Sequence, residues 1–461
     1  MSTQKTAPTP VVKDSWGSRF GFIMATAGFA VGLGAIWRFP YLVSENGGGA
    51  FVLVYIAISL LVGVPLFIAE LMLGRMTQRG PILGMRAITK KNSPFRAIGW
   101  LGTLASLLIM SYYVVILGFM LCYFVMTMMG TFSSGTSAAQ INQTYEDFTA
   151  NTPAIALAAL GICVLTGLII SRRLQDGIER ATKFLMPLLL IILTGLAFYV
   201  LIQPGAGAGV AWYLTPDFSL IDGSVILAAL GQAFFAIGIG VATAYTFGSY
   251  LNRHKSQIPG DALSIVLVNT VIAILAGFII FPAMHIYGLS EASGPGLVFL
   301  TMPNVFAQIP GGIIVGPIFF LLVLIAGLTS AIGYAEGVAG SLREVTGLSR
   351  KGSSWVTVGA ILVLGVPSIL SYGGHGPLSD FTPGGKDLFT WADFISGNIL
   401  MPLGALLIAI FIAAVFKFRR YKKEANRGAG AFKVQHWWKP LVSFVIPIAV
   451  AVIMITGLLP S

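Results

Sequence analysis

The stretch GFAVGLGAIWRFP, residues 28–40, is apolar enough to cross a membrane but contains residues that interrupt a helix. Glycines stand at positions 28, 32 and 34, and they are followed by Arg38 and Pro40. Glycine weakens a helix interior, and an arginine inside a bilayer is costly unless it has a partner. The stretch therefore predicts a transmembrane helix that is broken part-way, with a cation near the break.

The whole chain has the composition of a helical membrane protein. Of its 461 residues, 56% are hydrophobic and only 10% are charged, and apolar runs of about 20 residues recur from end to end. The sequence predicts an all-α polytopic fold. Eleven spans are expected, at roughly residues 20–43, 50–74, 97–128, 153–171, 183–203, 220–250, 259–290, 312–346, 354–372, 391–416 and 439–459.

The basic residues are distributed very unequally between the two sides of these spans. If the N-terminus is cytoplasmic, 26 of the 28 Lys and Arg residues fall in inside segments, and only Arg38 and Lys386 do not. The positive-inside rule then predicts a cytoplasmic N-terminus and an outside C-terminus in the cell (inner) membrane. The net charge of +11 belongs to the membrane surface on this interpretation, so no nucleic-acid partner is expected.

A second interruption, FFAIGIGVA at residues 234–242, repeats the pattern of the first. Gly238-Ile239-Gly240 corresponds to Gly32-Leu33-Gly34, so spans one to five and six to ten each open with a broken helix. Paired interruptions of this kind predict a midplane binding site in a secondary transporter, because unwound carbonyls can bind a cation and freed amides can bind an anion. Taken singly, such glycines could equally serve close helix packing.

These halves define the predicted domain organisation. A cytoplasmic N-terminal segment carrying an inner gate is expected first, followed by two repeats of opposite topology and a basic cytoplasmic loop with the eleventh span. The corresponding ranges are 1–19, 20–203, 204–416 and 417–461.

Longer motifs resemble a known family. GFAVGLGAIWRFPYLVSENGGGAF at 28–51 and VGVPLFIAELMLGR at 62–75 are similar to the first two helices of the neurotransmitter:sodium symporters. The resemblance runs from Trp16 to about residue 415 and implies the fold of the bacterial leucine transporter, a 5+5 inverted repeat. It is extended by SYYVV (111–115), GQAFFAIGIG (231–240), PGLVFLTMPNVFAQIPGG (295–312) and AGLTSAIG (326–333).

The resemblance implies an amino-acid site at the first break. Monoamine carriers have aspartate where this chain has Gly32, so the glycine is similar to carriers whose substrate brings its own carboxylate. That carboxylate is expected on the amides near Gly32, Leu33 and Gly34 and on the hydroxyl of Tyr113, although a buried tyrosine can also simply bond a backbone carbonyl. The other implied substrate positions are uncharged and suit a neutral, hydrophobic amino acid: Ala30, Ile109, Phe235, Gly238, Val241, Ser330 and Tyr334.

The family pattern contains two sodium sites, and the second is complete in this chain. Its implied ligands are five oxygens, a set that suits a hard cation. They are the carbonyls of Gly28, Val31 and Ala326 and the hydroxyls of Thr329 and Ser330.

The first sodium site departs from the family pattern. Ala35 stands in place of an asparagine ligand, Ala236 in place of a hydroxyl residue, and Ala273 in place of the serine or acid linked to chloride dependence. The carbonyl of Ala30 and the side chains of Tyr55, Gln232 and Asn269 remain. We therefore expect one sodium ion, at the second site, and no chloride; a partial first site filled by water is the alternative.

The resemblance also implies gates at both ends of the site. Arg38 and Asp393 are expected to pair and close the outer vestibule above an aromatic lid of Tyr113 and Phe235. The implied inner gate comprises Lys13, Trp16 and Glu344, with Ser249 and Tyr250 close by. Without the family, Lys13 and Glu344 would be read as a plain surface ion pair.

Two further features concern the inner half. Gly177 and Pro187 reproduce a spacing at which helix five of the family unwinds to let water reach sodium from inside. The buried acids Glu70 and Glu336 are expected to be structural and bonded to backbone.

The resulting hypothesis is a sodium-coupled symporter of neutral, hydrophobic amino acids that works by alternating access. A carrier of another small carboxylate or betaine-like solute and a non-transporting sensor remain alternatives. An enzyme is not expected, because the histidines and the cysteines Cys122 and Cys163 are scattered. The sequence leaves the particular amino acid and the oligomeric state open.

Overall fold

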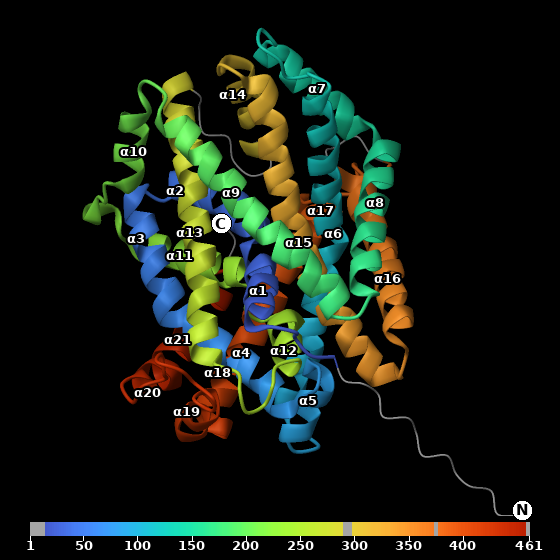
Figure 1. Cartoon of the computed structure of the whole chain (residues 1–461), viewed down its shortest axis with the longest axis vertical. Coiled ribbons are helices and arrows are strands. Elements are labelled where there is room, and N and C mark those ends of the chain that lie inside the picture. The colour runs from blue at the N-terminus through green and yellow to red at the C-terminus, as the bar shows by residue number, and fades with distance from the viewer. Residues whose placement is uncertain (1–13, 289–296, 373–376, 458–461) are drawn as a thin grey trace, which may run out of the picture.

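The computed structural model describes residues 14–288, 297–372 and 377–457, and every regular element within these ranges is a helix. Ten of these helices are long and apolar enough to cross a membrane, and a bent pair of helices makes an eleventh span. The predicted all-α fold with eleven spans is confirmed. Figure 1 shows the spans running roughly parallel to the long axis of the molecule.

The first five spans follow the predicted ranges closely, apart from the fifth. That span begins at Gln175 instead of near residue 183, because its polar first turns continue the helix and the Lys183 ammonium pairs with the Glu179 carboxylate at 2.6 Å. The spans are α1–η1–α2 (Arg19–Leu33, Gly34–Arg38, Phe39–Glu45), α3–η2–α4 (Gly49–Ile58, Ser59–Gly63, Val64–Thr77), α6 (Ala97–Met128), α8 (Thr152–Ile170) and η4–α9 (Gln175–Glu179, Arg180–Leu201).

The remaining six spans also match the predicted ranges to within a few residues. They are α11 with α12 (Gly223–Ile237, Ala242–Ser249), α13 (Ile258–Tyr287), α15 (Gly312–Thr346), α16 (Arg350–Ser371), α17–η9–α18–η10 (Leu388–Phe394, Ile395–Leu400, Met401–Ile410, Phe411–Phe416) and α20–η11–α21 (Trp438–Pro440, Leu441–Val445, Ile446–Thr456).

Short helices cap the two ends of the bundle (Figure 1). At one end, called here the α7 end, lie α7 (Ala138–Ala150), α10 (Ala206–Leu214) and η6–α14 (Leu297–Thr301, Met302–Gln308). At the opposite end, called the α19 end, lie α5 (Pro81–Ile88) and α19 (Phe418–Ala425). The short turns η3 (Pro94–Arg96), η5 (Phe218–Leu220) and η8 (Pro383–Gly385) complete the helical elements.

Both predicted breaks are present. Span one leaves helical geometry at Gly32, whose φ and ψ are 5° and −164°. Span six bends by 41° between Ile237 and Ala242. Gly238 and Gly240 have φ of 71° and 88° there, in the left-handed region that favours glycine. At Gly240 a Cβ atom would also lie 2.3 Å from the Met401 carbonyl oxygen, so the backbones of spans six and ten approach as closely as glycine allows.

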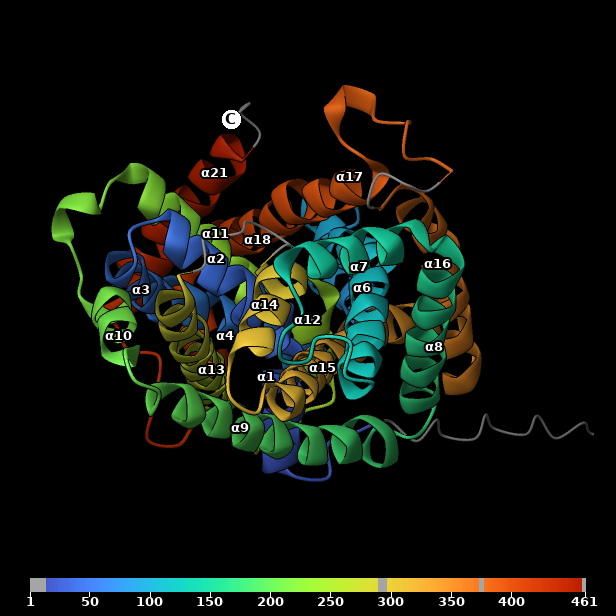
Figure 2. The ribbon, with the colours of Figure 1, turned by 90° about the horizontal axis from the view of Figure 1, so that it is seen from above.

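The broken helices lie inside the bundle. Viewed from above, α1, α12 and α15 are enclosed by α9, α13, α8, α16 and α18 (Figure 2). The walls of the interior are therefore protein, and a broken backbone at membrane depth is tolerated only where lipid does not reach it. This arrangement places both breaks where a buried site can form.

Candidate functional site

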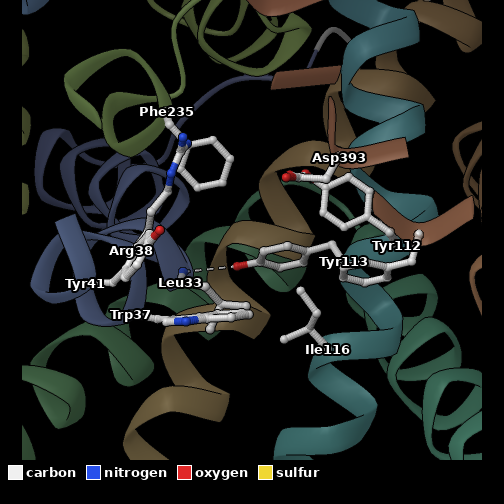
Figure 3. A pocket seen from close by; sticks show the side chains of 10 residues that line it. Leu33, Trp37, Arg38, Tyr41, Tyr112, Tyr113, Ile116, Phe235 and Asp393 are labelled. Atoms are coloured by element: carbon white, nitrogen blue, oxygen red, sulfur yellow. Dashed lines mark hydrogen bonds between the residues drawn. The ribbon is translucent and has the colours of Figure 1, made fainter. Parts of the chain in front are cut away.

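A cavity of about 190 Å³ lies on the α7 side of the first break (Figure 3). Aromatic rings form most of its wall, and it contains one cation and one anion. Its lining consists of Leu33, Trp37, Arg38, Tyr41, Tyr112, Tyr113, Ile116, Phe235, Phe389 and Asp393. We call it the outer cavity, after the side on which the sequence analysis expects the outside.

The two charged residues of the outer cavity do not pair with each other. The Arg38 guanidinium lies 4.6 Å from the centre of the Phe235 ring, while the Asp393 carboxylate accepts a hydrogen bond of 2.9 Å from the Tyr112 hydroxyl. Among the described residues no ion pair joins Arg38 to Asp393. The predicted gate is thus not closed in this structure, because each charge has another partner on its own side of the cavity (Figure 3).

The predicted aromatic lid is likewise not formed. The centre of the Tyr113 ring lies 6.1 Å from that of Tyr334, and the two ring planes meet at 65°. The Phe235 ring instead packs against the Arg38 guanidinium, which lies over its face. Phe235 also packs against Gly34, where a Cβ atom would come within 2.9 Å of its ring. The two lid residues therefore line opposite parts of the cavity instead of covering it.

The floor of the outer cavity is the break at Gly32. The Leu33 amide, which has lost its helical partner, donates to the Tyr113 hydroxyl at 3.3 Å (Figure 3). A Cβ atom at Gly32 would lie 2.5 Å from the Ser330 Oγ atom and 3.1 Å from the Tyr113 hydroxyl oxygen. The break thus brings a freed amide, a phenol and a serine hydroxyl together, and only glycine fits between them.

The other predicted substrate residues lie in the surrounding core. Ala30, Ile109, Val241 and Tyr334 are all buried in one continuous hydrophobic cluster, and a Cβ atom at Gly238 would meet the Phe29 ring at 2.4 Å. The Tyr334 ring itself packs edge-on against Phe29 at 5.1 Å. These contacts make an apolar, uncharged environment beneath the outer cavity.

Five oxygens form a buried cluster directly below the break, where α1 meets α15. The Thr329 hydroxyl donates to the carbonyls of Gly28 and Ala326, both at 2.9 Å. The Ser330 hydroxyl lies 3.2 Å from the Gly28 carbonyl oxygen and 2.7 Å from that of Phe29. Hydrogen bonds thus connect four of the five residues predicted for the second sodium site. Val31 is buried nearby without a hydrogen bond to the cluster, and the Phe29 carbonyl is an addition that the sequence did not indicate.

The position expected for the degenerate first site contains polar and apolar side chains side by side. The Gln232 amide donates to the Gly34 carbonyl at 2.7 Å, and the Asn269 amide donates to the Tyr55 hydroxyl at 3.2 Å. In the described part of the chain, the Oε1 atom of Gln232 and the Oδ1 atom of Asn269 are buried without a hydrogen-bond partner. The three substituted positions are fully enclosed and offer only methyl groups: Ala35, Ala236 and Ala273.

At the α19 end, the segment before α1 is fastened to span six and span five. The Trp16 indole donates to the Phe247 carbonyl at 3.0 Å, and its ring packs edge-on against Phe22, Phe247 and Tyr250. The Glu179 carboxylate accepts from the Gly17 amide at 2.7 Å and from the Ser18 hydroxyl at 2.9 Å. The segment before α1 is therefore anchored to both spans at this end of the molecule.

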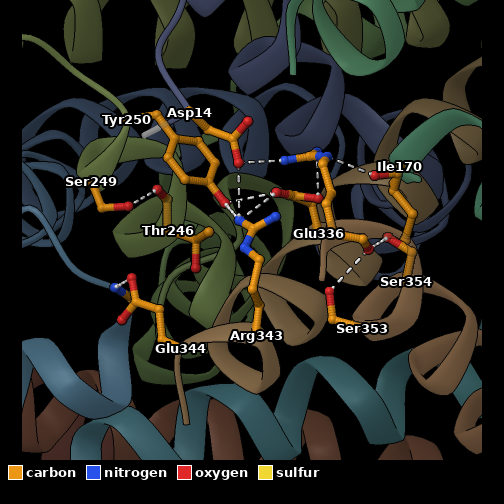
Figure 4. Close-up of polar contacts among 12 residues, drawn as sticks. Asp14, Ile170, Thr246, Ser249, Tyr250, Glu336, Arg343, Glu344, Ser353 and Ser354 are labelled. Atoms are coloured by element: carbon orange, nitrogen blue, oxygen red, sulfur yellow. Dashed lines mark hydrogen bonds and ion pairs between the residues drawn. The ribbon is translucent and has the colours of Figure 1, made fainter. Parts of the chain in front are cut away.

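A network of ion pairs surrounds the hydroxyl of Tyr250, whose ring lies 6.3 Å from that of Trp16 (Figure 4). The Asp14 carboxylate pairs with Arg350 at 2.8 Å and with Arg343 at 3.3 Å. The Glu336 carboxylate pairs with the same two arginines at 2.9 and 3.6 Å. The Tyr250 hydroxyl donates to Glu336 at 2.7 Å.

This network corrects one prediction. Glu336 was expected to bond the backbone, but its partners are the side chains of Tyr250, Arg343 and Arg350, because it lies where spans six, eight and nine meet. By contrast, Glu70 accepts from the Gly240 amide at 2.7 Å, as predicted. Ser249, expected close to the inner gate, directly precedes Tyr250, and its hydroxyl donates to the Thr246 carbonyl of its own helix at 2.7 Å.

The predicted Lys13–Glu344 pair cannot be placed in full, since Lys13 lies outside the described residues. Glu344 accepts a hydrogen bond of 2.7 Å from the Gly80 amide, which ties the end of span eight to the turn after span two. Gly177 lies in the wide first turn of span five, where a Cβ atom would be 2.2 Å from the Ile169 carbonyl oxygen. Pro187 lies inside α9, one residue after Met186, whose sulfur packs against Gly28.

Comparisons with known proteins identify the family of this chain. The sequence model of the sodium:neurotransmitter symporter family matches residues 13–153 and 138–460. An uncharacterised sodium-dependent transporter of Bacillus subtilis, YhdH, is 38% identical over 95% of this chain and 96% of its own length. The chain belongs to the sodium:neurotransmitter symporter family.

Other relatives show how far the likeness of this symporter extends. The sodium-dependent serotonin transporter of Drosophila melanogaster is 27% identical over 98% of this chain and 77% of that protein. The crystal structure of MhsT in complex with L-phenylalanine superposes with a TM-score of 0.86 at 36% identity, covering 96% of this chain and 99% of MhsT. The predicted family and its fold are confirmed, and the matching proteins are named as transporters.

The symporter also has functional candidates that sequence reasoning missed. Asp14, Arg343 and Arg350 lie at the centre of the ion-pair network, yet they belong to three separate segments. Only the spacing of Glu336 and Arg343, seven residues apart on one helix, signals that two of the charges share a face. Tyr112, the partner of Asp393, was also missed, because the sequence analysis assigned a role only to its neighbour Tyr113 in SYYVV.

Proposed function

We propose that this symporter carries neutral, hydrophobic amino acids together with sodium by alternating access, taking one sodium ion at the second site and no chloride. The observation that carries the proposal is the junction at Gly32. A freed amide and the Tyr113 hydroxyl lie on one side of it, and a buried set of five oxygens lies on the other.

The substrate is proposed to bind at the floor of the outer cavity. Its carboxylate would accept from the Leu33 amide and the Tyr113 hydroxyl, which lie within 3.3 Å of each other. Its side chain would lie among Ile109, Val241 and Tyr334, which carry no charge. L-phenylalanine bound to the 36%-identical MhsT supports a hydrophobic amino acid as the ligand.

Sodium is proposed to bind in the oxygen cluster as the co-transported ion. Neutral hydroxyl and carbonyl oxygens are the ligands that hard monovalent and divalent cations accept, and the cluster contains both kinds. It joins Gly28 of α1 to Thr329 and Ser330 of α15, so a bound cation would hold the broken helix against span eight. Binding there would stabilise the arrangement of the break that also receives the substrate, which couples the two ligands.

The same proposal assigns gating roles. Pairing of Arg38 with Asp393 would close the outer cavity, and release of Trp16 with the ion-pair network would open the α19 end. The start of span five would unwind between Gly177 and Pro187 to admit water to the cluster. The structure corresponds to an outward-facing state in this scheme, with the α19 end and the N-terminus cytoplasmic and the C-terminus outside.

Two other functions are distinguished by a single experiment. A carrier of another small carboxylate or a betaine would not require an α-amine, and a sensor would bind without accumulation. Purified protein in liposomes, with an inward sodium gradient, should accumulate labelled phenylalanine or leucine and lose accumulation when sodium is replaced by choline. N-trimethylated phenylalanine and phenylpropionate should not compete; competition by either would favour the first alternative, and sodium-dependent binding without accumulation would favour the second.

A further inference from the structure

A second cavity, of about 700 Å³, lies at the α19 end and shares no residue with the outer cavity. It is formed by the end of span ten, the helix α19 and the start of span eleven, which lie together at the lower left of Figure 1. Four cationic side chains line it: Lys417, Arg419, Lys422 and Lys439. His436 adds a titratable ring, and no acid contributes to the wall.

These cations have no acidic partner within the described residues. None of the four takes part in an ion pair, and none of their side chains makes a hydrogen bond there. Glu424 is the one acid between residues 417 and 461, and it pairs with Arg427 at 3.2 Å. Four like charges around one cavity repel each other, so the cavity favours an anion.

The backbone that carries these cations is fixed in place. Lys417 turns the chain out of span ten with φ of 68°, and the Tyr421 hydroxyl ties α19 to the Pro65 carbonyl at 3.0 Å. The buried Arg75 guanidinium donates to the carbonyls of Glu424 and Arg427, which end the helix. Asn426 closes the loop by two side-chain hydrogen bonds to the Val434 backbone, at 2.8 and 3.0 Å.

The opposite side of the cavity is apolar and continues along the bundle surface. Phe444 lines the cavity and is 64% exposed, and Ile448 one turn further is 62% exposed. Val415 on span ten is also exposed, and the exposed Trp437 comes directly before span eleven, where an aromatic ring suits a membrane interface. A ligand that fills this site therefore needs an anionic head and an apolar tail.

We propose that this cavity binds the headgroup phosphate of an anionic phospholipid, with the acyl chains lying along spans ten and eleven. Basic pockets between transmembrane helices suit such headgroups, and a free phosphate would leave the apolar surface beside it uncovered. Since α19 rests on span two through Tyr421, an occupied site would also hold the loop between spans ten and eleven against the bundle.

The test uses the full-length protein in detergent and native mass spectrometry, with phosphatidylglycerol and phosphatidylcholine of equal chain length as probes. We expect wild type to bind phosphatidylglycerol at least tenfold more tightly. The variant Lys417→Gln, Lys422→Gln, Lys439→Gln should lose most of that preference, because each cation contributes about fivefold. The matched control Lys91→Gln, Lys423→Gln, Lys433→Gln removes three exposed cations that do not line the cavity, two of them on α19 and the loop after it, and should keep the preference.

The outcomes separate the sources of the effect. An equal loss of phosphatidylglycerol preference in both triple variants would show that diffuse surface charge attracts the lipid, and it would overturn the site. Displacement of the lipid by glycerol 3-phosphate at equal concentration would indicate a soluble phosphate ligand, and it would also overturn the proposal. If the cavity triple variant does not fold, Lys439→Gln alone should still weaken phosphatidylglycerol about fivefold and leave phosphatidylcholine unchanged. An unchanged preference in that single variant would also overturn the proposal.

Discussion

One hydroxyl, that of Ser330, touches both halves of the proposed binding site. It lies within hydrogen-bond distance of the Gly28 and Phe29 carbonyls and directly beside the open space at Gly32. Neighbouring Thr329 faces only the oxygen cluster. Changes at Gly32, Thr329 and Ser330 should therefore test how sodium binding and substrate binding depend on each other.

The double variant Thr329→Ala, Ser330→Ala should abolish sodium-stimulated substrate binding. Each lost oxygen removes a contact to a charged ligand worth about 1.5–3 kcal/mol, so the sodium affinity should fall at least 100-fold. Scintillation proximity binding across a sodium titration measures this. Thr127→Ala, Ser341→Ala is the control, because those buried hydroxyls bond carbonyls of their own helices. Undiminished sodium dependence in the first variant would contradict the assignment.

Gly32→Ala should impair substrate and sodium together. The new Cβ atom would displace Ser330 Oγ and approach the Tyr113 hydroxyl, so we expect uptake to fall more than tenfold and the sodium midpoint to rise. Gly32→Asp should eliminate amino-acid uptake, because its carboxylate would occupy the place proposed for the substrate carboxylate. Gly195→Ala is the control, since nothing lies within 4 Å of a Cβ atom there. Normal affinity in Gly32→Ala would place the substrate elsewhere.

At the scale of residues, the sequence predicts contacts within one motif well, but it predicts poorly which side chains pair across the site. The glycines at both breaks, the Glu70 contact with backbone and the joined oxygens of Gly28 and Thr329 follow from motifs whose members lie on one or two elements. The partners of Arg38 and Asp393 do not follow, because a side chain in an open cavity can choose among several neighbours. A sequence motif fixes which residues face a site, but not which conformation of that site is occupied.

At the scale of elements, the segment before α1 is bonded to spans five, six, eight and nine. Trp16 reaches the Phe247 carbonyl, Gly17 and Ser18 reach Glu179, and Asp14 reaches two arginines. Sequence reasoning expected Trp16 and a Lys13–Glu344 pair at this end, and the pair stays a prediction because Lys13 lies outside the described residues. The ion pairs of Asp14 join three segments that are far apart in the chain, and no periodicity can reveal such contacts.

Asp14→Asn should weaken the attachment of this segment to the bundle. The variant leaves Arg343 and Arg350 with Glu336 as their one remaining acid in the network. We therefore expect about tenfold faster labelling of a cysteine introduced at position 246, where the native threonine is buried. The background carries Cys122→Ala and Cys163→Ala, and the reagent is a membrane-permeant maleimide. Asp176→Asn, an exposed acid at the start of span five, is the control and should label at the wild-type rate.

For the whole molecule, the fold class, the eleven spans and the inverted repeat could be predicted because hydropathy and paired glycines mark them directly. The number of coupled ions is a property of the complete transport cycle, and here the sequence offers only a substitution pattern. Ala35, Ala236 and Ala273 are enclosed, while the amide oxygens of Gln232 and Asn269 beside them lack partners among the described residues. Those two orphan oxygens are what a water or a weakly held ion would need.

Coupling stoichiometry decides between these possibilities. A tenfold sodium gradient supplies about 1.4 kcal/mol and −100 mV about 2.3 kcal/mol per charge, so one sodium ion supports roughly 500-fold accumulation of a zwitterion and two would square that ratio. We expect one positive charge to enter per substrate. Clamping the voltage of proteoliposomes against a known substrate gradient, and finding the potential at which net flux vanishes, measures this ratio directly.

The same preparation provides the control for chloride. Replacing chloride by gluconate on both sides should leave the reversal potential and the uptake rate unchanged, because Ala273 offers no group to balance an anion beside Tyr55 and Gln232. A two-to-one ratio would mean that the Gln232 and Asn269 oxygens, with water and backbone carbonyls, rebuild a cation site without the missing side chains. In that case the three alanines would change the affinity of the first site and not its existence, and the one-sodium mechanism would have to be abandoned.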